Sequence, residues 1–312
     1  MMRISAIDVG SNGMRMVIGE VDESRNVHVV ENIRLPVRLG QDVFSKGYLE
    51  EKTIQQTEEA FLHFRHVADG FNVARMRAVA TSAAREAANN DLLVDRIFRA
   101  TGIEIEIISG EDEARLIHAG VAHVLDLKDK RTLLIDIGGG STELIYGNES
   151  GFSRAVSLNL GSVRLTEKFL RSDPVHPDEV ARMNTVINEE LDRLSNQGLS
   201  ADPTLALVGI AGTFTTLAAM EKSLARYSHS EVHGSTLTID AVIRQRERLE
   251  RRSIAERRQI AGLEPQRADV IFAGACLVER IMARYHARRV IVSDHGVRYG
   301  LLHEAARALQ KC

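Results

Sequence analysis

The stretch Ile7-Asp8-Val9-Gly10-Ser11-Asn12-Gly13 recurs, with small changes, as Ile135-Asp136-Ile137-Gly138-Gly139-Gly140-Ser141. Aligned without a gap, the two copies continue to Gly19 and Gly147, so each reads as an apolar strand, an aspartate, a glycine-rich turn and a second strand. Glycines let a turn bring its N–H groups close to an anion, and an aspartate at a strand end can hold a divalent cation or a water. The repeat therefore predicts two similar domains that face one cleft and handle phosphate groups.

The length of the chain allows two domains, and its net charge argues against a polyanionic partner held by overall electrostatic attraction. The chain has 312 residues, of which 44% are hydrophobic and 27% are charged. A domain holds roughly 100–200 residues, so two are expected. Forty basic against 43 acidic residues leave a net charge of −3, which argues against binding to nucleic acid or to an anionic membrane. An anionic substrate then needs a local basic patch.

The cysteines and the N-terminus indicate a reducing compartment. Cys276 and Cys312, the two cysteines, have neither zinc-site spacing nor the pattern of a disulfide framework. The chain enters a strand directly at residues 1–8, and no apolar run approaches the roughly 20 residues that span a bilayer. We expect a soluble, unexported, cytoplasmic protein without nucleic-acid or membrane partners; a homodimer is one oligomeric state open to it.

Strand and helix patterns occur in the same order in both halves. Three strands are expected first, then helices and strands up to a helix of about 15 residues from Glu111, and the order strand, strand, strand, helix restarts at Thr132. The polar stretch 126–131 is the candidate crossover, which gives domains at 1–125 and 126–297. The expected strands lie at 3–9, 14–20, 27–37, 75–80, 104–108, 132–137, 142–146, 152–158, 204–208 and 290–293; the main helices lie at 51–69, 81–88, 91–101, 163–170 and 177–197.

The two hairpins carry the first candidate site residues. Asp8, Ser11 and Asn12 lie at a turn whose amides can cradle a phosphate, although a single copy would also fit an ordinary β-hairpin. Three consecutive glycines in the second copy are costly unless the backbone must approach something. Glu143, which aligns with Arg15, can share a hard, oxygen-liganded metal such as Mg²⁺ or Mn²⁺ with Asp136; the alternative is a solvent-facing strand residue.

Three further segments have both a functional and a purely structural interpretation. The loop at 209–216 runs from a buried strand into a helix that Thr213 is expected to cap. The free N–H groups at the helix start can bind an anion, but the same residues also fit a helix that is merely well capped. The acids at 111–113 can simply stabilise the positive end of the helix dipole. Alternatively, one of them leans into the cleft and acts as a general base towards water. Arg85, after a strand, is either a fork for phosphate oxygens or a surface arginine.

Two charged features remain open. Residues 244–258 contain seven arginines and three glutamates, which form either a solvated helix face or a wall along which a polyanion lies. His229 and His233 have the i, i+4 spacing of helical metal ligands, but the Ser-Glu-Val between them reads as loop-to-strand, which disfavours metal ligation.

Five segments together resemble the successive motifs of the exopolyphosphatase/guanosine pentaphosphate phosphohydrolase (Ppx/GppA) family, in the family's order and over nearly the whole chain. They are residues 8–12, 80–85, 108–115, 135–143 and 209–216. The resemblance implies an α/β fold of two ribonuclease H-like domains, as in the actin, sugar kinase and Hsp70 ATPase superfamily, which close over a phosphate-binding cleft. It also implies that a C-terminal helix within 298–312 packs back on the first domain.

The resemblance also assigns roles. Glu113 is implied as the base that activates water, and Asp8, Asp136 and Glu143 as the residues that hold Mg²⁺, with Mn²⁺ as an alternative. In-line attack on the terminal phosphorus would then release orthophosphate. The phosphate-binding groups implied by the motifs and the third loop are Ser11, Asn12, Arg85, Gly138, Gly139, Gly140, Ser141, Gly212 and Thr213.

The sequence departs from the family pattern in three ways. Gly13 stands where a hydroxyl residue is common, which removes one possible phosphate contact. Phe214 replaces a small residue in the third loop and is expected to narrow any nucleoside pocket. The chain is expected to be the short two-domain form, without the HD-like helical domain of longer members.

The expected function is hydrolysis of a terminal phosphoanhydride. The substrate is inorganic polyphosphate, as for an exopolyphosphatase, or guanosine pentaphosphate, as for a guanosine-5'-triphosphate,3'-diphosphate phosphatase of the stringent response. One alternative is a small-molecule kinase of the same superfamily that uses ATP; it would yield a phosphorylated acceptor rather than free phosphate. Another is a non-enzymatic actin-like nucleotide-binding scaffold, which would be little affected by loss of the Glu113 carboxylate.

Overall fold

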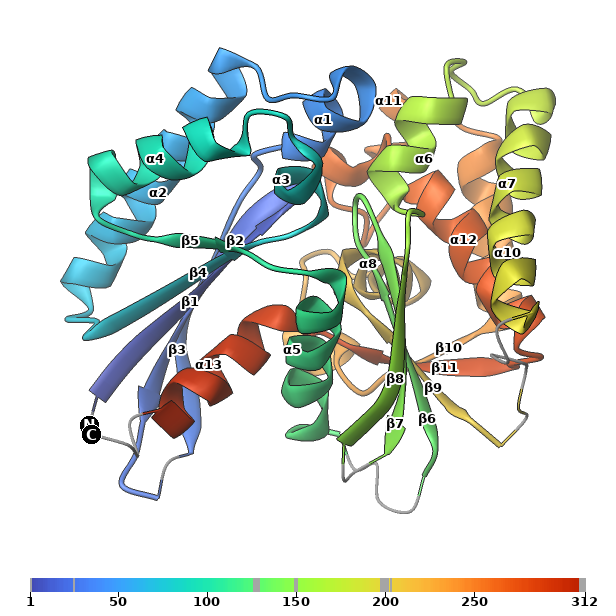
Figure 1. Cartoon of the computed structure of the whole chain (residues 1–312). Coiled ribbons are helices and arrows are strands. Elements are labelled where there is room, and N and C mark those ends of the chain that lie inside the picture. Colours follow the sequence, from blue (N-terminus) through green and yellow to red (C-terminus); the bar gives the residue numbers. More distant parts are fainter. Residues whose placement is uncertain are drawn as a thin grey trace. The chain divides into compact units, whose positions relative to one another are not determined.

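The structure is a computed structural model that describes residues 2–24, 26–125, 130–148, 151–196, 202 and 204–308. It consists of two compact units. The first unit comprises Met1–Val124 and His295–Cys312, and the second comprises Leu125–Asp294. Each unit has its own β-sheet flanked by helices (Figure 1). Most of the expected crossover at 126–131 lies outside the described residues, as do residues 309–312 of the segment 298–312.

The first unit is built on a five-stranded sheet in the order β3-β2-β1-β4-β5. β1, β4 and β5 are parallel, whereas β1, β2 and β3 form an antiparallel meander. The sequence of β1 is mostly apolar because a central strand is buried on both faces of the sheet. The strands are β1 (Met2–Gly10), β2 (Gly13–Val21), β3 (Val27–Leu35), β4 (Arg75–Ala80) and β5 (Ile105–Ile107).

Six helices lie among the described residues of the first unit. One of them, α1, has no counterpart among the expected elements. The last helix, α13, packs against α5, where Gly120 and Gly300 let the two backbones approach closely (Figure 1). The helices are α1 (Leu39–Lys46), α2 (Glu51–Gly70), α3 (Ser82–Glu86), α4 (Asn90–Thr101), α5 (Gly110–Ala122) and α13 (Val297–Ala308).

The second unit has a six-stranded sheet in the order β10-β11-β9-β6-β7-β8. Its strands are β6 (Thr132–Ile137), β7 (Thr142–Asn148), β8 (Gly151–Leu158), β9 (Ala206–Ile210), β10 (Thr236–Thr238) and β11 (Arg289–Ser293). Its helices are α6 (Ser162–Phe169), α7 (Pro177–Asn196), α8 (Ala211–Glu221), α9 (His229–Val232), α10 (Ile239–Glu250), α11 (Ile254–Arg257) and α12 (Ile271–Arg284), with a short 3-10 helix, η1 (Pro265–Arg267).

The two sheets share one topology. β6, β7, β8, β9 and β11 pair in the same order and directions as β1 to β5. The register is also the same, because Asp8 lies opposite Arg15 and Asp136 lies opposite Glu143. An α/β chain with two copies of one sheet, as predicted from the repeated hairpin, is confirmed.

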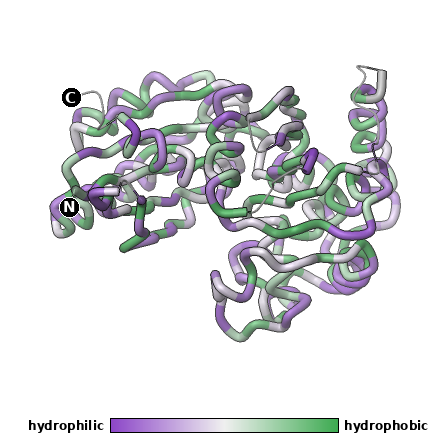
Figure 2. Tube along the Cα trace, turned by 90° about the horizontal axis from the view of Figure 1, so that it is seen from below, coloured by the Kyte–Doolittle hydropathy of each residue, from purple (hydrophilic) through white to green (hydrophobic). Residues whose placement is uncertain are grey.

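Each unit has its own apolar core. The cluster of the first unit includes Phe61 and Phe64, and that of the second unit includes Phe214 and Phe272, all with no exposed surface. Figure 2 shows hydrophobic and hydrophilic residues interleaved along the trace. Among the described residues, no helix combines the length and the apolar character needed to cross a membrane.

Candidate phosphate-binding and catalytic site

The predicted site residues of the first unit follow the ends of its three parallel strands. Ser11 and Asn12 follow β1, Arg85 lies in the short helix after β4, and Glu113 lies in the helix after β5. In open α/β sheets, ligands bind outside the carboxyl ends of the parallel strands. The fold therefore brings these residues to the edge of the sheet where binding is expected.

The tip of the first hairpin carries a buried amide that lacks hydrogen bonds. The N–H of Gly40, at the start of α1, donates to the carbonyl of Ser11 at 2.8 Å, and a Cβ at position 40 would lie 2.9 Å from Ser11. Both polar side-chain atoms of Asn12 are buried and have no hydrogen-bond partner within the described part of the chain. Because unsatisfied buried amides are costly, this side chain is suited to a polar ligand or an ordered water.

Only one of the three acids at the start of α5 is buried. Ser109 caps the helix and accepts from the N–H of Asp112 at 3.0 Å, while Glu111 and Asp112 are exposed. Glu113 is 7% exposed, and its Oε2 lies 3.6 Å from Nη1 of Arg85. Arg85 Nη1 also donates to the carbonyl of Ile108 at 2.6 Å. Capping thus accounts for Asp112 but not for Glu113, whose carboxylate is oriented by an arginine.

Asp8 has a more basic environment than its counterpart in the second unit. Burial raises the pKa of Asp8, and the positive charges of Arg298 and Arg15 oppose that rise. Arg298 is itself buried and donates from Nη1 to Oδ1 of Asn32 at 2.8 Å. In the sequence Arg298 served only to mark the start of the C-terminal helix, so its nearness to Asp8 was not foreseen.

Asp136 and Glu143 form a buried acidic pair in the second unit. They face each other directly across the β6–β7 ladder and are 8% and 1% exposed. Ser157 donates from Oγ to Oε1 of Glu143 at 2.7 Å, which fixes the orientation of that carboxylate. Neighbouring carboxylates repel each other unless a cation or a proton is shared, and oxygen ligands suit hard cations. This donor set fits Mg²⁺.

The tri-glycine loop is pressed against the start of α6. A Cβ at Gly161 would lie 2.4 Å from the backbone of Gly139, so position 161 needs glycine for packing. The N–H groups of Ser162 and Val163 donate to the carbonyls of Gly138 and Gly139 at 3.0 and 2.9 Å. The first amides of α6 are therefore bonded to the loop, which fixes the loop's shape.

The rest of the second turn is short and closed. The N–H of Gly138 donates to the carbonyl of Ser141 at 3.0 Å, and Ser141 is 3% exposed. Arg164 donates from Nε to the carbonyl of Gly140 at 2.7 Å. All four predicted phosphate-binding residues of this loop thus lie in one rigid turn at the end of β6.

The third loop differs from its expected structure. β9 continues to Ile210, and α8 begins at Ala211, whose φ is 65°; the helix has no side-chain cap. Thr213 is therefore not the N-cap, and the prediction that it caps the helix was wrong. Its Oγ1 donates instead to the carbonyl of Ile137 at 3.3 Å, which ties α8 to the end of β6.

Phe214 does not line a ligand pocket. It is fully buried in the core of the second unit, and a Cβ at Gly209 would lie 2.2 Å from its ring. The expectation that Phe214 narrows a nucleoside pocket was wrong, because the ring points into the core and Gly209 makes room for it.

Sequence reasoning missed one basic residue at this loop, Arg267. Its side chain, on η1, is almost buried and lies against Gly212, where an added Cβ would be 1.9 Å from Nη2. A guanidinium beside the positive end of α8 favours an anion, and in this structure Nε of Arg267 lies 3.9 Å from Oε2 of Glu264. The segment Pro265-Gln266-Arg267 matches no phosphate-binding sequence pattern. The place of Arg267 at this loop is therefore visible only from its packing against Gly212.

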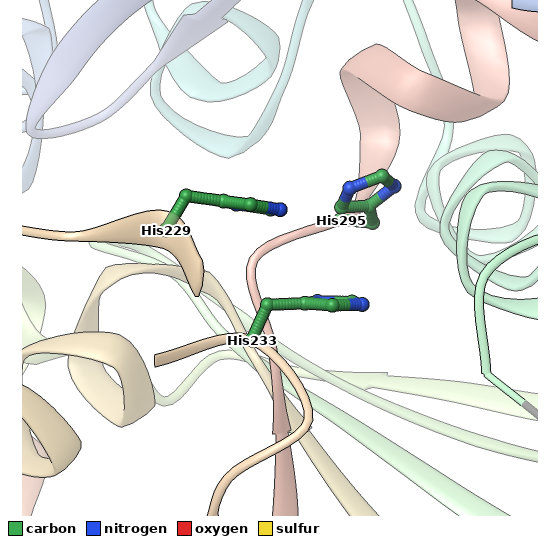
Figure 3. Close-up of side chains that lie close together, drawn as sticks. All are labelled: His229, His233 and His295. Carbon is green, nitrogen blue, oxygen red and sulfur yellow. The ribbon is translucent and has the colours of Figure 1, made fainter. Parts of the chain in front are cut away.

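His229 begins a short helix, α9, and His233 follows its end with an extended backbone, where a loop-to-strand segment was expected. The two imidazole rings are parallel, with centroids 5.1 Å apart and an interplanar angle of 9° (Figure 3). His229 donates from Nδ1 to Oδ2 of Asp294 at 3.1 Å, which raises its pKa. Nδ1 of His233 accepts from the N–H of Asp294 at 3.3 Å, and burial and His229 lower the pKa of His233.

Comparison with known proteins identifies the family. The model of the Ppx/GppA phosphatase family matches residues 17–308. Exopolyphosphatase 2 of Mycobacterium tuberculosis is 31% identical over 311 residues, which cover 96% of this chain and 97% of that protein. A bifunctional 3-dehydroquinate synthase/phosphatase of Fusobacterium nucleatum is 31% identical over 302 residues, which cover 93% of this chain but only 45% of that protein.

Solved structures agree. The crystal structure of the Aquifex aeolicus member of the Ppx/GppA family superposes with a TM-score of 0.82 at 31% sequence identity, over 99% of this chain and 98% of that one. The resemblance drawn from the motifs and the predicted fold class are both confirmed. The chain belongs to the Ppx/GppA phosphatase family.

Proposed function

We propose that this chain is an exopolyphosphatase, which releases orthophosphate from the end of inorganic polyphosphate. Family membership supports phosphatase chemistry, and the relative from Mycobacterium tuberculosis is named for polyphosphate. The observation that carries the proposal is Glu113, the one buried acid at the start of α5, held 3.6 Å from the guanidinium of Arg85. A carboxylate oriented beside a phosphate-binding arginine is suited to activating water.

The proposed reaction needs one proton acceptor and several phosphate-binding groups. Glu113 accepts a proton from water as the water oxygen bonds to the terminal phosphorus. The bridging P–O bond breaks, and its electrons leave with the shortened chain. Arg85 and the Asn12 amide bind the oxygens of the terminal phosphate, whose charge they offset. General base catalysis of this kind is worth about 10²–10⁴ in rate.

We further propose that Asp136 and Glu143 of the second unit hold Mg²⁺. When bound, the ion would offset negative charge on phosphate oxygens. The acidic pair and the hydrogen bond from Ser157 support this assignment. Asp8 has two arginines nearby, so a cation is less favoured there.

The basic run at 244–258 favours an elongated substrate over a compact nucleotide. Its arginines are divided between two roles. Arg246 is paired with Glu250 and Glu279, and Arg257 is buried, where it donates to the carbonyl of Leu249. Arg244 pairs with Glu221 at 2.6 Å, and four arginines, two on α10 and two just after its end, line a shallow groove together with Glu247 and Glu256. These arginines are Arg244, Arg248, Arg251 and Arg252.

The test is phosphate release by wild type and by Glu113→Gln, with Glu111→Gln as the matched control. Both acids lie in the first turn of α5, but only Glu113 is buried. We expect Glu113→Gln to slow release from polyphosphate by about 10²–10⁴ and Glu111→Gln to leave it unchanged. Equal rates in wild type and Glu113→Gln would overturn the assignment of the base.

The same assay separates the substrates. Long polyphosphate, short polyphosphate, guanosine pentaphosphate and ATP are compared with and without Mg²⁺. Faster release from long polyphosphate supports the proposal; faster release from guanosine pentaphosphate would contradict it. Phosphate transfer from ATP to a hydroxyl, without free phosphate, would point to a kinase instead.

A further inference from the structure

A cavity of about 400 Å³ lies within the first unit, between α13, the end of α5 and the start of β3. Its volume falls in the range of roughly 300–1,000 Å³ that is usual for small-molecule sites. It is distinct from the strand-end edge that carries Asn12, Arg85 and Glu113, none of which lines it. Its described lining residues include none that is acidic.

The rim of the cavity carries histidine and arginine side chains, and the hydrogen bonds of His123 show which of its ring nitrogens donates and which accepts. His123 donates from Nδ1 to the carbonyl of Ala119 at 2.7 Å, so its Nε2 is the acceptor that faces Nη2 of Arg307 at 3.3 Å. The ring of His123 stacks on that of His303 with centroids 4.0 Å apart. Burial, together with His123 and Arg307, lowers the pKa of His303 to about 4. Arg307 carries the single guanidinium among the described lining residues.

The walls offer flat and apolar surfaces. The rings of His123 and His303 are nearly parallel, at 15°, and so are those of His295 and Tyr299, whose centroids are 3.5 Å apart. Val29, on the exposed edge strand β3, is 44% exposed and forms part of the floor. Flat rings and apolar side chains favour a planar ring as ligand.

We propose that this cavity binds a nucleoside monophosphate. The stacked rings and the apolar floor would hold the base, and the guanidinium of Arg307 would bind the phosphate. The single guanidinium among the described lining residues matches one phosphate better than a chain of phosphates. The site is separate from the proposed catalytic residues, so the inference does not depend on the polyphosphatase assignment.

The experiment is NMR of the histidine rings in the whole chain during titration with AMP and GMP, with adenosine and inorganic phosphate as component probes. We expect AMP or GMP to shift the His123 and His303 resonances saturably, and each component alone to bind at least tenfold more weakly. Absence of a saturable shift up to about 5 mM, or an equal effect of inorganic phosphate alone, would overturn the proposal.

Three variants complete the test. Arg307→Gln should weaken binding about tenfold or more, because a charge-assisted hydrogen bond is lost. Val29→Trp should do the same by filling the floor from an exposed strand position, which leaves the core intact. Arg99→Gln is the control, because its side chain is 82% exposed on α4 of the same unit and does not line the cavity. Unchanged binding in both cavity variants would refute the site.

Discussion

A single added methyl group at Gly161 tests whether the tri-glycine loop must keep its shape for catalysis. The φ of Gly161 is −146°, an extended conformation that alanine adopts without strain. The added Cβ, however, would lie 2.4 Å from the carbonyl carbon and oxygen of Gly139 and 2.5 Å from the nitrogen of Gly140, whereas ordinary contact begins at 3.4 Å. Because all three atoms belong to the backbone, no side chain can rotate away. The loop or α6 must therefore move by about 1.0 Å.

Gly161→Ala should impair phosphate release more than it impairs folding. A misplacement of about 1 Å in groups that position a substrate can cost ~10²-fold in rate. Overpacking of this kind costs about 1–3 kcal/mol in the free energy of unfolding. We therefore expect kcat on polyphosphate to fall about 100-fold, while the second unit remains folded with a Tm lower by several degrees.

The assay is steady-state phosphate release together with thermal unfolding followed by circular dichroism. Arg164→Gln is the companion variant, because it removes the hydrogen bond to the carbonyl of Gly140 without adding bulk, and it should give a smaller loss. If Gly161→Ala folds and retains the wild-type rate, the loop is not a precise binding element, and the three glycines serve packing alone.

The remaining predictions concern packing, pH and metal binding. Gly300→Ala should destabilise the first unit by about 3 kcal/mol or more in urea unfolding, since its Cβ would lie 2.0 Å from a backbone oxygen of α5; Gly70→Ala, with nothing within 4 Å, should stabilise by about 0.5 kcal/mol. His303 has a folded-state pKa of about 4 against 6.5, so below pH 6.5 the unfolded chain binds a proton that the folded chain does not. The Tm should therefore fall from pH 6.5 towards 4, and His303→Gln should flatten that slope. Glu143→Gln should weaken Mn²⁺ binding, measured by electron paramagnetic resonance, at least tenfold, and Ser157→Ala less so; equal affinity in all three proteins would contradict the metal assignment.

Local patterns were sufficient to predict the elements that are buried in their own unit. The strand expected at 132–137 agrees with β6 to the residue, because every position of it is buried and apolar residues run through it. α1 was missed because one of its buried residues is an aspartate whose partners lie in the segment that follows the helix. Asp42, buried in α1, accepts from Oγ1 of Thr53 at 2.5 Å and from the N–H of Glu50 at 3.1 Å. Because this buried residue is polar, the sequence lacks the regular apolar spacing that predicts an amphipathic helix.

The candidate site divides in the same way. The closeness of Asp136 and Glu143 could be predicted from the sequence, because the two strands of a hairpin pair in a fixed register. Arg267 was not readable, because its position depends on a 3-10 helix that returns to Gly212 from 55 residues further along the chain. Thr213 was assigned wrongly since threonine near a helix start usually caps it, whereas here it bonds to the carbonyl of Ile137 on β6.

The duplicated sheet separates what the fold supplies from what individual residues supply. In both units a strand-end aspartate lies in the same register, so the backbone offers the same position twice. The residue across the ladder decides what that position can bind. Arg15 opposite Asp8 supplies a positive charge from within the protein, which leaves little need for an added cation. Glu143 opposite Asp136 doubles the negative charge in a buried place, and two buried carboxylates require a positive partner or a shared proton. Arg298 and Arg15 beside Asp8, against Glu143 beside Asp136, thus distinguish the two copies of one hairpin, with phosphate binding proposed for the first and metal binding for the second.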